Sequence, residues 1–283
     1  MQEAIESVYR QTYSDWEIIF WDNQSTDRSA EIARAYDSRL RYFKSEAFTT
    51  LGAARRLAIE HATGDWIAFL DCDDFWYPHK LATQIQAVKD TDFVLCYGGI
   101  NEIDEEGRKL REVFPKHESG YQLEKQLNQF EVHLVTALVL ASALKKYGLT
   151  FDDHTTASEE YNLFLRLSAK GPVRVIHQTL ACYRISTTSL TTRNMSKWAH
   201  ERAYTLDQLK IENPGVDRQY KQAFAEASAR GIYYDARYLH SSGDSRGARK
   251  VMRSISGRSF RYRLLYVSLF VPYMWAVLHS NLL

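Results

Sequence analysis

The first half of the chain alternates short apolar runs with segments of helical periodicity. The apolar runs have the length and the β-branched and aromatic content of strands, and the segments between them carry apolar residues at helical spacing. Strands that alternate with helices predict βαβ units, a mostly parallel sheet and a three-layer α/β domain. The predicted strands are Trp16–Trp21, Leu40–Phe43, Trp66–Leu70 and Phe93–Tyr97, and the predicted helices are Asp27–Tyr36, Ala53–His61 and Pro78–Lys89.

The pattern changes in the second half of the chain. A middle block combines an apolar strand, a helix and two more strand-like runs, and from about Ser196 the periodicity is helical. We therefore expect an α/β domain over residues 1–195 and a helical C-terminal region over 196–283. The block contains strands near Leu134–Leu140, Val173–His177 and Leu180–Ile185 and a helix at about Ser158–Ala169, and the later helices are Lys197–Lys210, Tyr220–Leu239 and Ser245–Ile255.

Acidic loops follow two of the predicted strands. Asp22–Asp27 follows the first strand, and Asp71, Asp73 and Asp74 follow the third. In parallel sheets the carboxyl ends of strands are where ligands bind. Alternate carboxylates there can point into one pocket, where they repel each other unless a cation lies between them, and such oxygen ligands suit Mg²⁺ or Mn²⁺. The alternative is a solvated turn in which the aspartates cap a helix.

A second acidic pair, Glu159 and Glu160, opens the helix EEYNLFLRLSAKG. Glutamate is favoured in the first turn of a helix by the helix dipole, which is the structural interpretation. In the functional interpretation one of the two is a general base beside a reacting hydroxyl. Adjacent helical positions point about 100° apart, so only one of them would face a pocket.

Composition excludes some classes of partner and compartment. The 36 basic and 35 acidic residues nearly cancel, so no global charge attracts nucleic acid. The three cysteines, Cys72, Cys96 and Cys182, form no CxxC pair and are typical of reduced thiols. The charged start MQEAIESVYRQ does not resemble a signal peptide, so we expect a cytoplasmic protein.

The C-terminal region ends in a basic segment followed by an apolar one. Residues 246–263 contain seven arginines and lysines and no acidic residue, and LLYVSLFVPYMWAVL (Leu264–Leu278) is uncharged over 15 residues. This run is shorter than the roughly 20 residues that span a bilayer. The pattern is typical of an interfacial anchor on an anionic membrane surface, so we expect peripheral membrane contact through residues 246–278. A packed or dimer-forming helix is the alternative, and no nucleic-acid recognition motif accompanies the basic residues.

Several linked motifs, in order and spacing, resemble family 2 inverting glycosyltransferases. They are AIESVYRQTYSDWEIIFWDNQSTDRS, LGAARRLAIEHATGDWIAFLDCDDFWYPHKL, YGGINEIDEEGR, ASEEYNLFLRLSAKGPV and LACYRISTTSLT. The resemblance covers about Ala4 to Thr192 and implies the nucleotide-sugar-binding GT-A fold. It begins inside what would be the family's first helix, so the family's first strand is expected to be missing from this sequence.

The resemblance implies roles for residues of the donor site. Asp22 would contact the nucleotide base, with Ser25 nearby, and Arg55 would border the nucleotide. Asp71 and Asp73 would form the DxD motif, in which Asp71 holds the ribose or the metal and Asp73 binds Mn²⁺ or Mg²⁺ directly.

The later motifs imply the base and the closing of the site. Glu160 matches the family's catalytic base, which is usually aspartate, and Glu159 matches the glutamate before it. Tyr183 and Arg184 match a motif that helps close the site over the diphosphate. The sequence departs from the family pattern at Asn23, Gln24, Arg56 and Ser186.

The implied function is transfer of a sugar, with inversion, from a nucleotide-sugar donor to a glycan or lipid-linked acceptor in surface polysaccharide synthesis. Trp76 and Tyr77 are candidate sugar-stacking platforms, and specificity for the donor sugar and the acceptor is expected mainly in Phe114–His133. The alternative is a non-catalytic, membrane-associated relative that acts by binding a partner. A nucleotidyltransferase would be expected to carry a glycine-rich basic loop near the N-terminus, which this sequence lacks.

Overall fold

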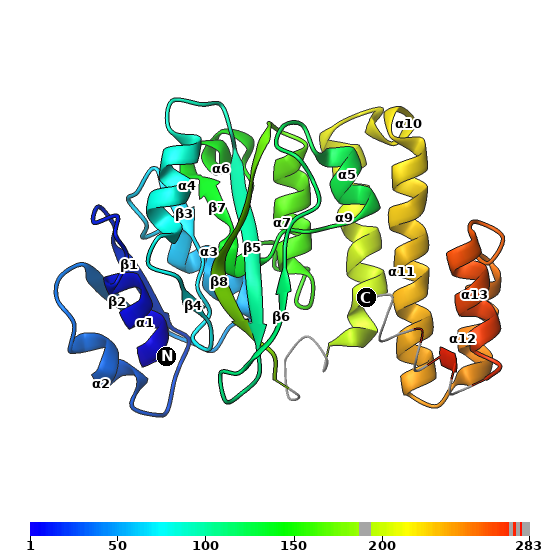
Figure 1. Ribbon diagram of the computed structural model, residues 1–283, viewed down its shortest axis with the longest axis horizontal. Helices are drawn as coiled ribbons and strands as arrows, with labels where there is room; N and C mark the ends of the chain where they lie inside the picture. The colour runs from blue at the N-terminus through cyan, green and yellow to red at the C-terminus, as the bar shows by residue number, and fades with distance from the viewer. Residues whose placement is uncertain (187–193, 272–273, 276–277, 279–283) are drawn as a thin grey trace. The chain divides into compact units, whose positions relative to one another are not determined.

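The computed structural model describes residues 1–186, 194–271, 274–275 and 278 (Figure 1). By its internal contacts the chain divides into two compact units, Met1–Ser189 and Leu190–Leu283. The described strands all belong to the first unit, and the described elements of the second unit are helices. The last motif of the family resemblance, which ends at Thr192, runs beyond the described residues.

The strands of the first unit form two sheets. Within the described residues β1 pairs with β2 alone, in parallel, and these two strands are not joined to the larger, six-stranded sheet. The strand order in the larger sheet is β3-β7-β5-β8-β4, and β6 pairs with β5. The strands are β1 (Ile18–Asp22), β2 (Leu40–Lys44), β3 (Trp66–Ala68), β4 (Phe75–Trp76), β5 (Leu95–Ile103), β6 (Lys109–Val113), β7 (Leu138–Leu140) and β8 (Val173–Arg184).

The larger sheet is mixed, which corrects the prediction of a mostly parallel sheet. β5 and β8 are parallel, whereas β3–β7, β5–β7, β4–β8 and β5–β6 are antiparallel. β7 lies within a predicted strand but runs antiparallel to both β3 and β5, and an apolar run does not encode strand direction. β4 and β6 were not predicted, since β4 has only two residues and the side chains of β6 are almost all exposed. Neither strand has the apolar run that marks a strand in sequence.

Strand β8 is continuous over 12 residues, where two strands were predicted. Its pairing with β5 shifts register where Gly98 faces Ile176 and Gly99 faces Thr179, so His177 and Gln178 bulge outward. The polar pair interrupts the apolar pattern without ending the strand, as β-bulges do. The bulge lets one strand run from the centre of the sheet to the candidate site at its carboxyl end.

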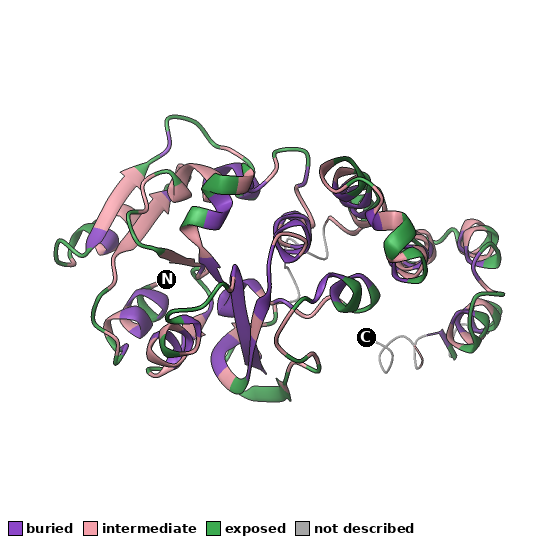
Figure 2. Cartoon of the chain, turned by 90° about the horizontal axis from the view of Figure 1, so that it is seen from above, coloured by how far each residue is buried: buried purple, intermediate pink, exposed green. Residues whose placement is uncertain are grey.

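Helices cover both faces of the larger sheet, which confirms the three-layer arrangement (Figure 2). Leu95 of β5 packs with Phe164 of α7 on one face, and the next residue, Cys96, packs with Val88 of α4 on the other. Every residue of β5 is buried, so this strand lies at the centre of the core. The helices of this unit are α1 (Gln2–Tyr9), α2 (Ser29–Arg34), α3 (Leu51–Ile59), α4 (Lys80–Val88), α5 (Leu123–Asn128), α6 (Ala141–Tyr147) and α7 (Glu159–Ser168), with a 3₁₀ turn η1 (Leu134–Thr136).

The second unit is built around one long helix, α11, which packs against α9 and α12. Its core joins Tyr233 of α11, Met252 of α12 and Leu265 of α13, all of them buried. Among the described residues, none of the helices has the length and apolar character needed to cross a bilayer. The elements are η2 (Met195–Lys197), α9 (Trp198–Glu212), α10 (Val216–Gln219), α11 (Lys221–Ser241), α12 (Ser245–Arg253) and α13 (Phe260–Ser268).

Candidate functional site

Three elements of the first unit bring the candidate residues together. Helix α3 carries Arg55 and begins at Thr50, whose hydroxyl accepts a hydrogen bond from the backbone N–H of Ala53 at 3.3 Å. Strand β3 leads into the loop that begins with Asp71, and helix α7 opens with Glu159. Asp71 lies in the loop after β3, and Glu159 and Glu160 lie in the first turn of α7. The acidic residues therefore lie at the ends of their elements, where functional side chains are commonly found.

Arg55 joins the two acidic motifs. Its Nη2 donates to both carboxylate oxygens of Asp71, at 2.8 and 2.9 Å. Its Nη1 donates to Oε1 of Glu159 at 3.1 Å and to Oε1 of Glu160 at 3.4 Å. The Arg55 side chain is only 10% exposed, so these charge-assisted hydrogen bonds form largely out of water, where they are strong. One guanidinium thus links the first aspartate of the DxD motif to both glutamates.

The two glutamates differ in how far they are exposed. The side chain of Glu159 is 8% exposed and that of Glu160 is 35% exposed. Desolvation raises the pKa of Glu160 to about 7, against the opposing charge of Arg55, and the charges of Asp71 and Glu159 add to the rise. A carboxylate with a pKa near 7 that a substrate can reach suits a general base at neutral pH.

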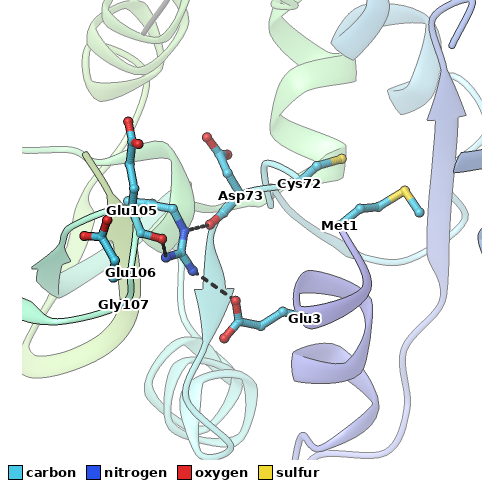
Figure 3. Close-up of a pocket in the computed structure, with 8 residues that line it drawn as sticks. Met1, Glu3, Cys72, Asp73, Glu105, Glu106 and Gly107 are labelled. Carbon is cyan, nitrogen blue, oxygen red and sulfur yellow. Dashed lines mark hydrogen bonds and ion pairs between the residues drawn. The ribbon is translucent and has the colours of Figure 1, made fainter. Parts of the chain in front are cut away.

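A cavity of about 510 Å³ lies beside the DxD motif (Figure 3). Asp73 and Cys72 line it from the loop after β3, and Glu3 lines it from α1. The turn between β5 and β6 closes another side through Glu105 and Gly107. The lining is polar and largely acidic, so the cavity has room and charge for a cation-bound ligand.

Arg184, at the end of β8, holds the walls of this cavity together. Its backbone N–H donates to Oδ1 of Asp74 at 2.8 Å, and its Nε donates to the carbonyl oxygen of Asp73 at 2.9 Å. Its Nη2 donates to Oε2 of Glu3 at 2.9 Å (Figure 3), and its Nη1 donates to the carbonyl oxygen of Glu105 at 3.0 Å. The side chain therefore ties α1, the DxD loop and the β5–β6 turn to one strand.

Asp22 and Ser25 form a local cluster at the end of β1. Both carboxylate oxygens of the buried Asp22 have partners, since Oδ1 accepts the backbone N–H of Ser25 and Oδ2 accepts the hydroxyl of Tyr42, each at 2.6 Å. Burial opposes ionisation of Asp22, but these hydrogen bonds lower its pKa overall. Gln24, one of the departures from the family pattern, has a φ of 69°, in the left-handed region that favours glycine.

Trp76 is not a sugar platform, which corrects one of the predictions. It is 7% exposed, and its Nε1 donates to the carbonyl oxygen of Val135 at 2.9 Å. The Nζ of Lys80 lies 4.0 Å from the centroid of the Trp76 ring. Trp76 is therefore part of the core between β4 and α4, whereas the neighbouring Tyr77 reaches a second cavity, described below.

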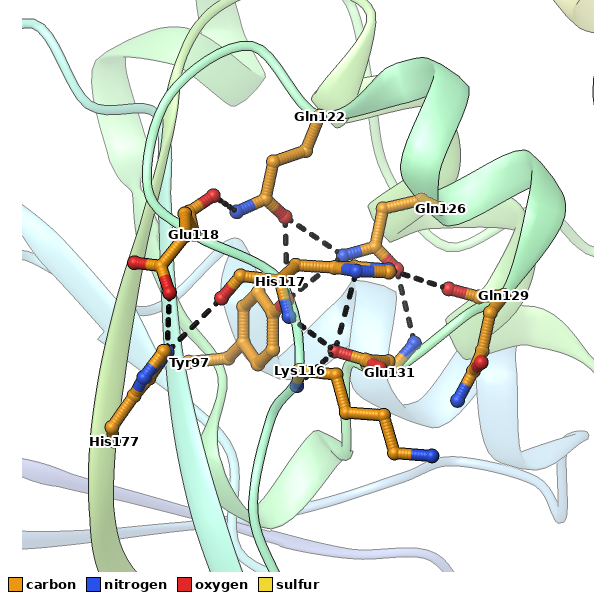
Figure 4. Close-up of polar contacts among 9 residues, drawn as sticks. All are labelled: Tyr97, Lys116, His117, Glu118, Gln122, Gln126, Gln129, Glu131 and His177. Carbon is orange, nitrogen blue, oxygen red and sulfur yellow. Dashed lines mark hydrogen bonds and ion pairs between the residues drawn. The ribbon is translucent and has the colours of Figure 1, made fainter.

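A polar network holds the segment Phe114–His133 (Figure 4). The carboxylate of Glu131 accepts the backbone N–H of His117 at 3.1 Å. The side chain of Gln126 donates to the hydroxyl of Tyr97 at 3.1 Å, which connects the segment to the central strand β5. The segment in which specificity was expected is therefore connected by hydrogen bonds to the sheet.

Comparison with known proteins assigns the first unit to a family. The sequence pattern described as "Glycosyl transferase family 2" matches residues 1–148, more than half of the chain. The chain belongs to glycosyl transferase family 2. The prediction made from the linked motifs is thereby confirmed.

Curated relatives in this family include proteins of several bacteria. An uncharacterised glycosyltransferase of Haemophilus influenzae is 30% identical over 196 residues, which cover 68% of this chain and 76% of the relative. WfgD of Escherichia coli, named a UDP-Glc:alpha-D-GlcNAc-diphosphoundecaprenol beta-1,3-glucosyltransferase, is 26% identical over 69% of this chain and 75% of its own length. A Rickettsia felis relative is 29% identical over 70% of this chain, but the match spans only about a third (33%) of that protein.

Solved structures support the same fold. A crystal structure of S. aureus TarS in complex with UDP has a TM-score of 0.64 to this chain at 14% identity, covering 99% of this chain and 86% of that one. At this level of identity the likeness shows the fold alone. The GT-A fold expected of family 2 is therefore confirmed, with a mixed sheet.

The residues of the site fit a divalent cation that is held partly by a ligand. Asp73 offers the carboxylate oxygens that Mg²⁺ and Mn²⁺ prefer, and Asp71 could join it only through lone pairs that its two hydrogen bonds from Arg55 leave over. Burial together with the charges of Asp73, Asp71 and Glu160 raises the pKa of Asp74 to about 8. Among the described residues, however, no group of three His, Cys, Asp or Glu side chains could hold a metal ion by itself. A cation here would complete its coordination with oxygens from outside the chain, such as phosphate oxygens.

The structure adds cavity residues that sequence reasoning had given no role. Glu105 and Gly107 belong to the motif YGGINEIDEEGR, which was part of the resemblance, and the φ of 84° at Gly107 marks the turn. Glu3 carried no signal, because it is one of several charged positions on an exposed helix face. Its place in the cavity depends on the ion pair with Arg184, which is distant in sequence.

Replacing Arg55 should destabilise the first unit. Arg55→Met removes the guanidinium that Asp71, Glu159 and Glu160 share, and breaking a buried ion pair from one side costs about 3–5 kcal/mol. The measurement is urea unfolding at pH 7.5, with Arg56→Met as the control. Arg56 is half-buried and pairs with more exposed acids, so its loss should cost about 1 kcal/mol or less. Equal effects of the two substitutions would contradict the role given to Arg55.

Proposed function

We propose that this chain is an inverting glycosyltransferase that moves a sugar from a nucleotide-sugar donor to a hydroxyl of a glycan or lipid-linked acceptor. The observation that carries the proposal is the Arg55 cluster, in which an aspartate of the DxD motif and an accessible glutamate share one buried guanidinium. Donor-side and acceptor-side chemistry require such carboxylates within one site. Membership of glycosyl transferase family 2 supports the reaction type.

In the proposed reaction the oxygen of the acceptor hydroxyl attacks the anomeric carbon of the donor sugar. Glu160 accepts the proton of that hydroxyl during the attack. The bond between that carbon and the phosphate oxygen breaks on the opposite face, and its electron pair leaves with the nucleoside diphosphate. A single displacement inverts the configuration and needs no covalent intermediate on the enzyme. Asp73, with Asp71, would hold Mn²⁺ or Mg²⁺, which when bound neutralises charge on the diphosphate leaving group.

The proposed donor is a UDP-sugar, with Asp22 and Ser25 on the base side and Arg184 beside the diphosphate. The names of two similar proteins support a uridine nucleotide, since WfgD is named for UDP-Glc and the TarS crystal contains UDP. WfgD is also named for a diphosphoundecaprenol acceptor, which supports a lipid-linked acceptor in polysaccharide synthesis. Glu160 is the proposed base rather than Glu159, because Glu159 is buried against Arg55.

Donor binding should depend on the cation and on Asp73. In calorimetric titrations with UDP in the presence of Mn²⁺, Asp73→Asn should weaken binding at least tenfold, because one hard oxygen ligand is lost. Asp90→Asn, which changes an exposed aspartate outside the cavity, should bind like the wild type. GDP and dTDP serve as competing nucleotides. Equal affinity of wild type and Asp73→Asn for UDP, or an affinity for UDP that is the same with and without Mn²⁺, would contradict the proposal.

The pH dependence of transfer should report Glu160. Below its pKa of about 7 this carboxyl is protonated and cannot accept the acceptor's proton, so kcat/KM for the acceptor should rise with pH between 6 and 8. Glu160→Gln should lower kcat by a factor of roughly 10² or more and abolish this acid limb. The assay is release of UDP from a UDP-sugar in the presence of acceptor.

Glu159→Gln is the matched control for that experiment. It changes the adjacent carboxyl, so it should keep the acid limb and lose less activity than Glu160→Gln. If instead Glu159→Gln removes the acid limb and Glu160→Gln keeps it, the roles of the two glutamates are reversed. A folded protein that binds donor but transfers no sugar would favour the non-catalytic alternative.

Peripheral membrane contact through residues 246–278 is part of the proposal and rests on helix α13. One face of α13 is buried in the second unit through Tyr262, Leu265 and Leu269. Large apolar side chains are exposed at both ends of this helix. Phe260, its first residue, is 78% exposed, and Phe270, two residues past its end, is 57% exposed. Exposed apolar side chains beside a basic segment are typical of binding to an anionic lipid surface.

Membrane binding should be lost when this exposed surface is made polar. The double substitution Phe260→Ser, Phe270→Ser should lower the fraction that floats with vesicles of 30% phosphatidylglycerol several-fold, because apolar area that enters the interface is lost. Ile211→Ser, at a 78% exposed position on α9, should float like the wild type. Point substitutions are preferable to deletion of residues 258–283, which would remove buried core residues of α13. Unchanged flotation of the double variant would rule out this anchor.

A further inference from the structure

The first unit contains a second cavity, of about 410 Å³, whose lining residues differ from those of the cavity beside the DxD motif. It lies where β5, β6 and the bulge of β8 meet the segment after β4. Residues that line it are Tyr77, His79, Asn101, Glu112, Phe114 and Thr179.

The walls of this second cavity are held in fixed positions. The Tyr77 hydroxyl accepts a hydrogen bond from Nδ2 of Asn101 at 2.6 Å. The ring of His79 lies nearly parallel to that of Tyr77, with centroids 6.0 Å apart, and its Nε2 lies 3.1 Å from the carbonyl oxygen of Thr179. The bulge of β8 thus supplies the partner that orients His79. A cavity with preset walls requires little ordering when a ligand binds.

Asn101 leaves a hydrogen-bonding group unused at this cavity. The residue is 8% exposed, and its Oδ1 has no hydrogen-bond partner. A buried acceptor without a partner costs about 1–3 kcal/mol, so such groups in folded proteins call for an explanation. A ligand hydroxyl can reach this oxygen only if the Asn101 amide moves, so Asn101, unlike Tyr77 and His79, is not preset for binding.

The chemistry of the lining suits a neutral, polyhydroxylated ligand. Phe114 is 46% exposed and offers an aromatic face, and Tyr77 adds a second aromatic ring with a hydroxyl. Glu112 accepts hydrogen bonds from the Thr179 hydroxyl through Oε1 and from Nζ of Lys109 through Oε2, and each of these oxygens has a further lone pair for a ligand hydroxyl. Among the described residues that line the cavity there is no lysine or arginine, so it does not suit a phosphate group.

We infer that this cavity is a second binding site, for a neutral hexopyranose unit of a glycan. The C–H face of the sugar packs on Phe114, and its hydroxyls hydrogen-bond with Glu112, Tyr77 and Asn101. That the sugar belongs to the acceptor or product glycan rests on the proposed function. Binding of a neutral sugar at the cavity does not, because none of these residues takes part in the proposed transfer.

Saturation-transfer NMR tests the site with three probes, the methyl β-glycosides of glucose, galactose and N-acetylglucosamine. UDP and Mg²⁺ are added in excess to fill the donor site, because Mg²⁺ is diamagnetic and leaves the proton signals sharp. We expect saturation of the ring protons of at least one probe, with affinity reduced about threefold to tenfold in Phe114→Ala, because a stacking contact is lost. Glu112→Gln should weaken binding to a smaller degree.

Tyr121→Ala is the matched control, since Tyr121 is a 79% exposed aromatic residue in the same segment that lines neither cavity. It should bind the probe like the wild type. Absence of saturation for all three probes, or equal losses in Phe114→Ala and Tyr121→Ala, would overturn the inference. Asp73→Asn separates the two proposals, because it should lose UDP binding and keep probe binding. Loss of the probe signal in Asp73→Asn would place the sugar in the donor site and would likewise overturn the inference.

Discussion

The candidate site depends on one buried positive charge, the guanidinium of Arg55. It meets three carboxylates that come from two other parts of the chain, the loop after β3 and the start of α7. Transfer of these groups out of water is unfavourable unless each charge has a partner with good geometry. The apolar core beneath, where Phe164 of α7 packs with Phe69 and Phe151, fixes the backbones. The arginine then keeps three like charges close together that would otherwise repel each other.

The same arginine leaves one carboxylate available for chemistry. Glu159 and Glu160 bond to the same Nη1, yet they differ about fourfold in side-chain exposure, at 8% and 35%. The buried member can serve as a structural counter-ion, and the more exposed one can meet a substrate. Adjacent positions on a helix point in different directions, so a glutamate pair at a helix start can divide these tasks between its two members. Glu160 thereby combines a pKa raised to about 7 with a partly exposed side chain.

Sequence reasoning predicted the parts of the fold that have strong local patterns. Strands β1, β2, β3 and β5 and helices α3, α4 and α7 follow apolar runs or helical periodicity. Strand β4, with two residues, and β6, with exposed side chains, have no such pattern, and their pairing is set by tertiary contacts.

In the candidate site, too, only features with a local sequence pattern could be predicted. The linked motifs identified the acidic residues, but the bond between Arg55 and Glu159 joins positions 104 residues apart, and no spacing could reveal it. The hydrogen bonds from Arg184 to backbone carbonyl oxygens could not be predicted from the sequence either, because every residue has a carbonyl acceptor.

The three aspartates of the loop after β3 lie within four residues but differ in their partners and in their burial. Asp71 is paired with Arg55 through both oxygens, and Asp73 lines the cavity beside the motif. Asp74 is 3% exposed and accepts the backbone N–H of Arg184, so it joins the loop to the end of β8. Burial raises the pKa of Asp74 to about 8, which keeps this third carboxyl largely neutral at pH 7 and limits the charge that the loop must tolerate. A loop in which all three were ionised and unpaired would repel itself. The protein instead neutralises one aspartate by an arginine and another by burial, and Asp73 lines the cavity.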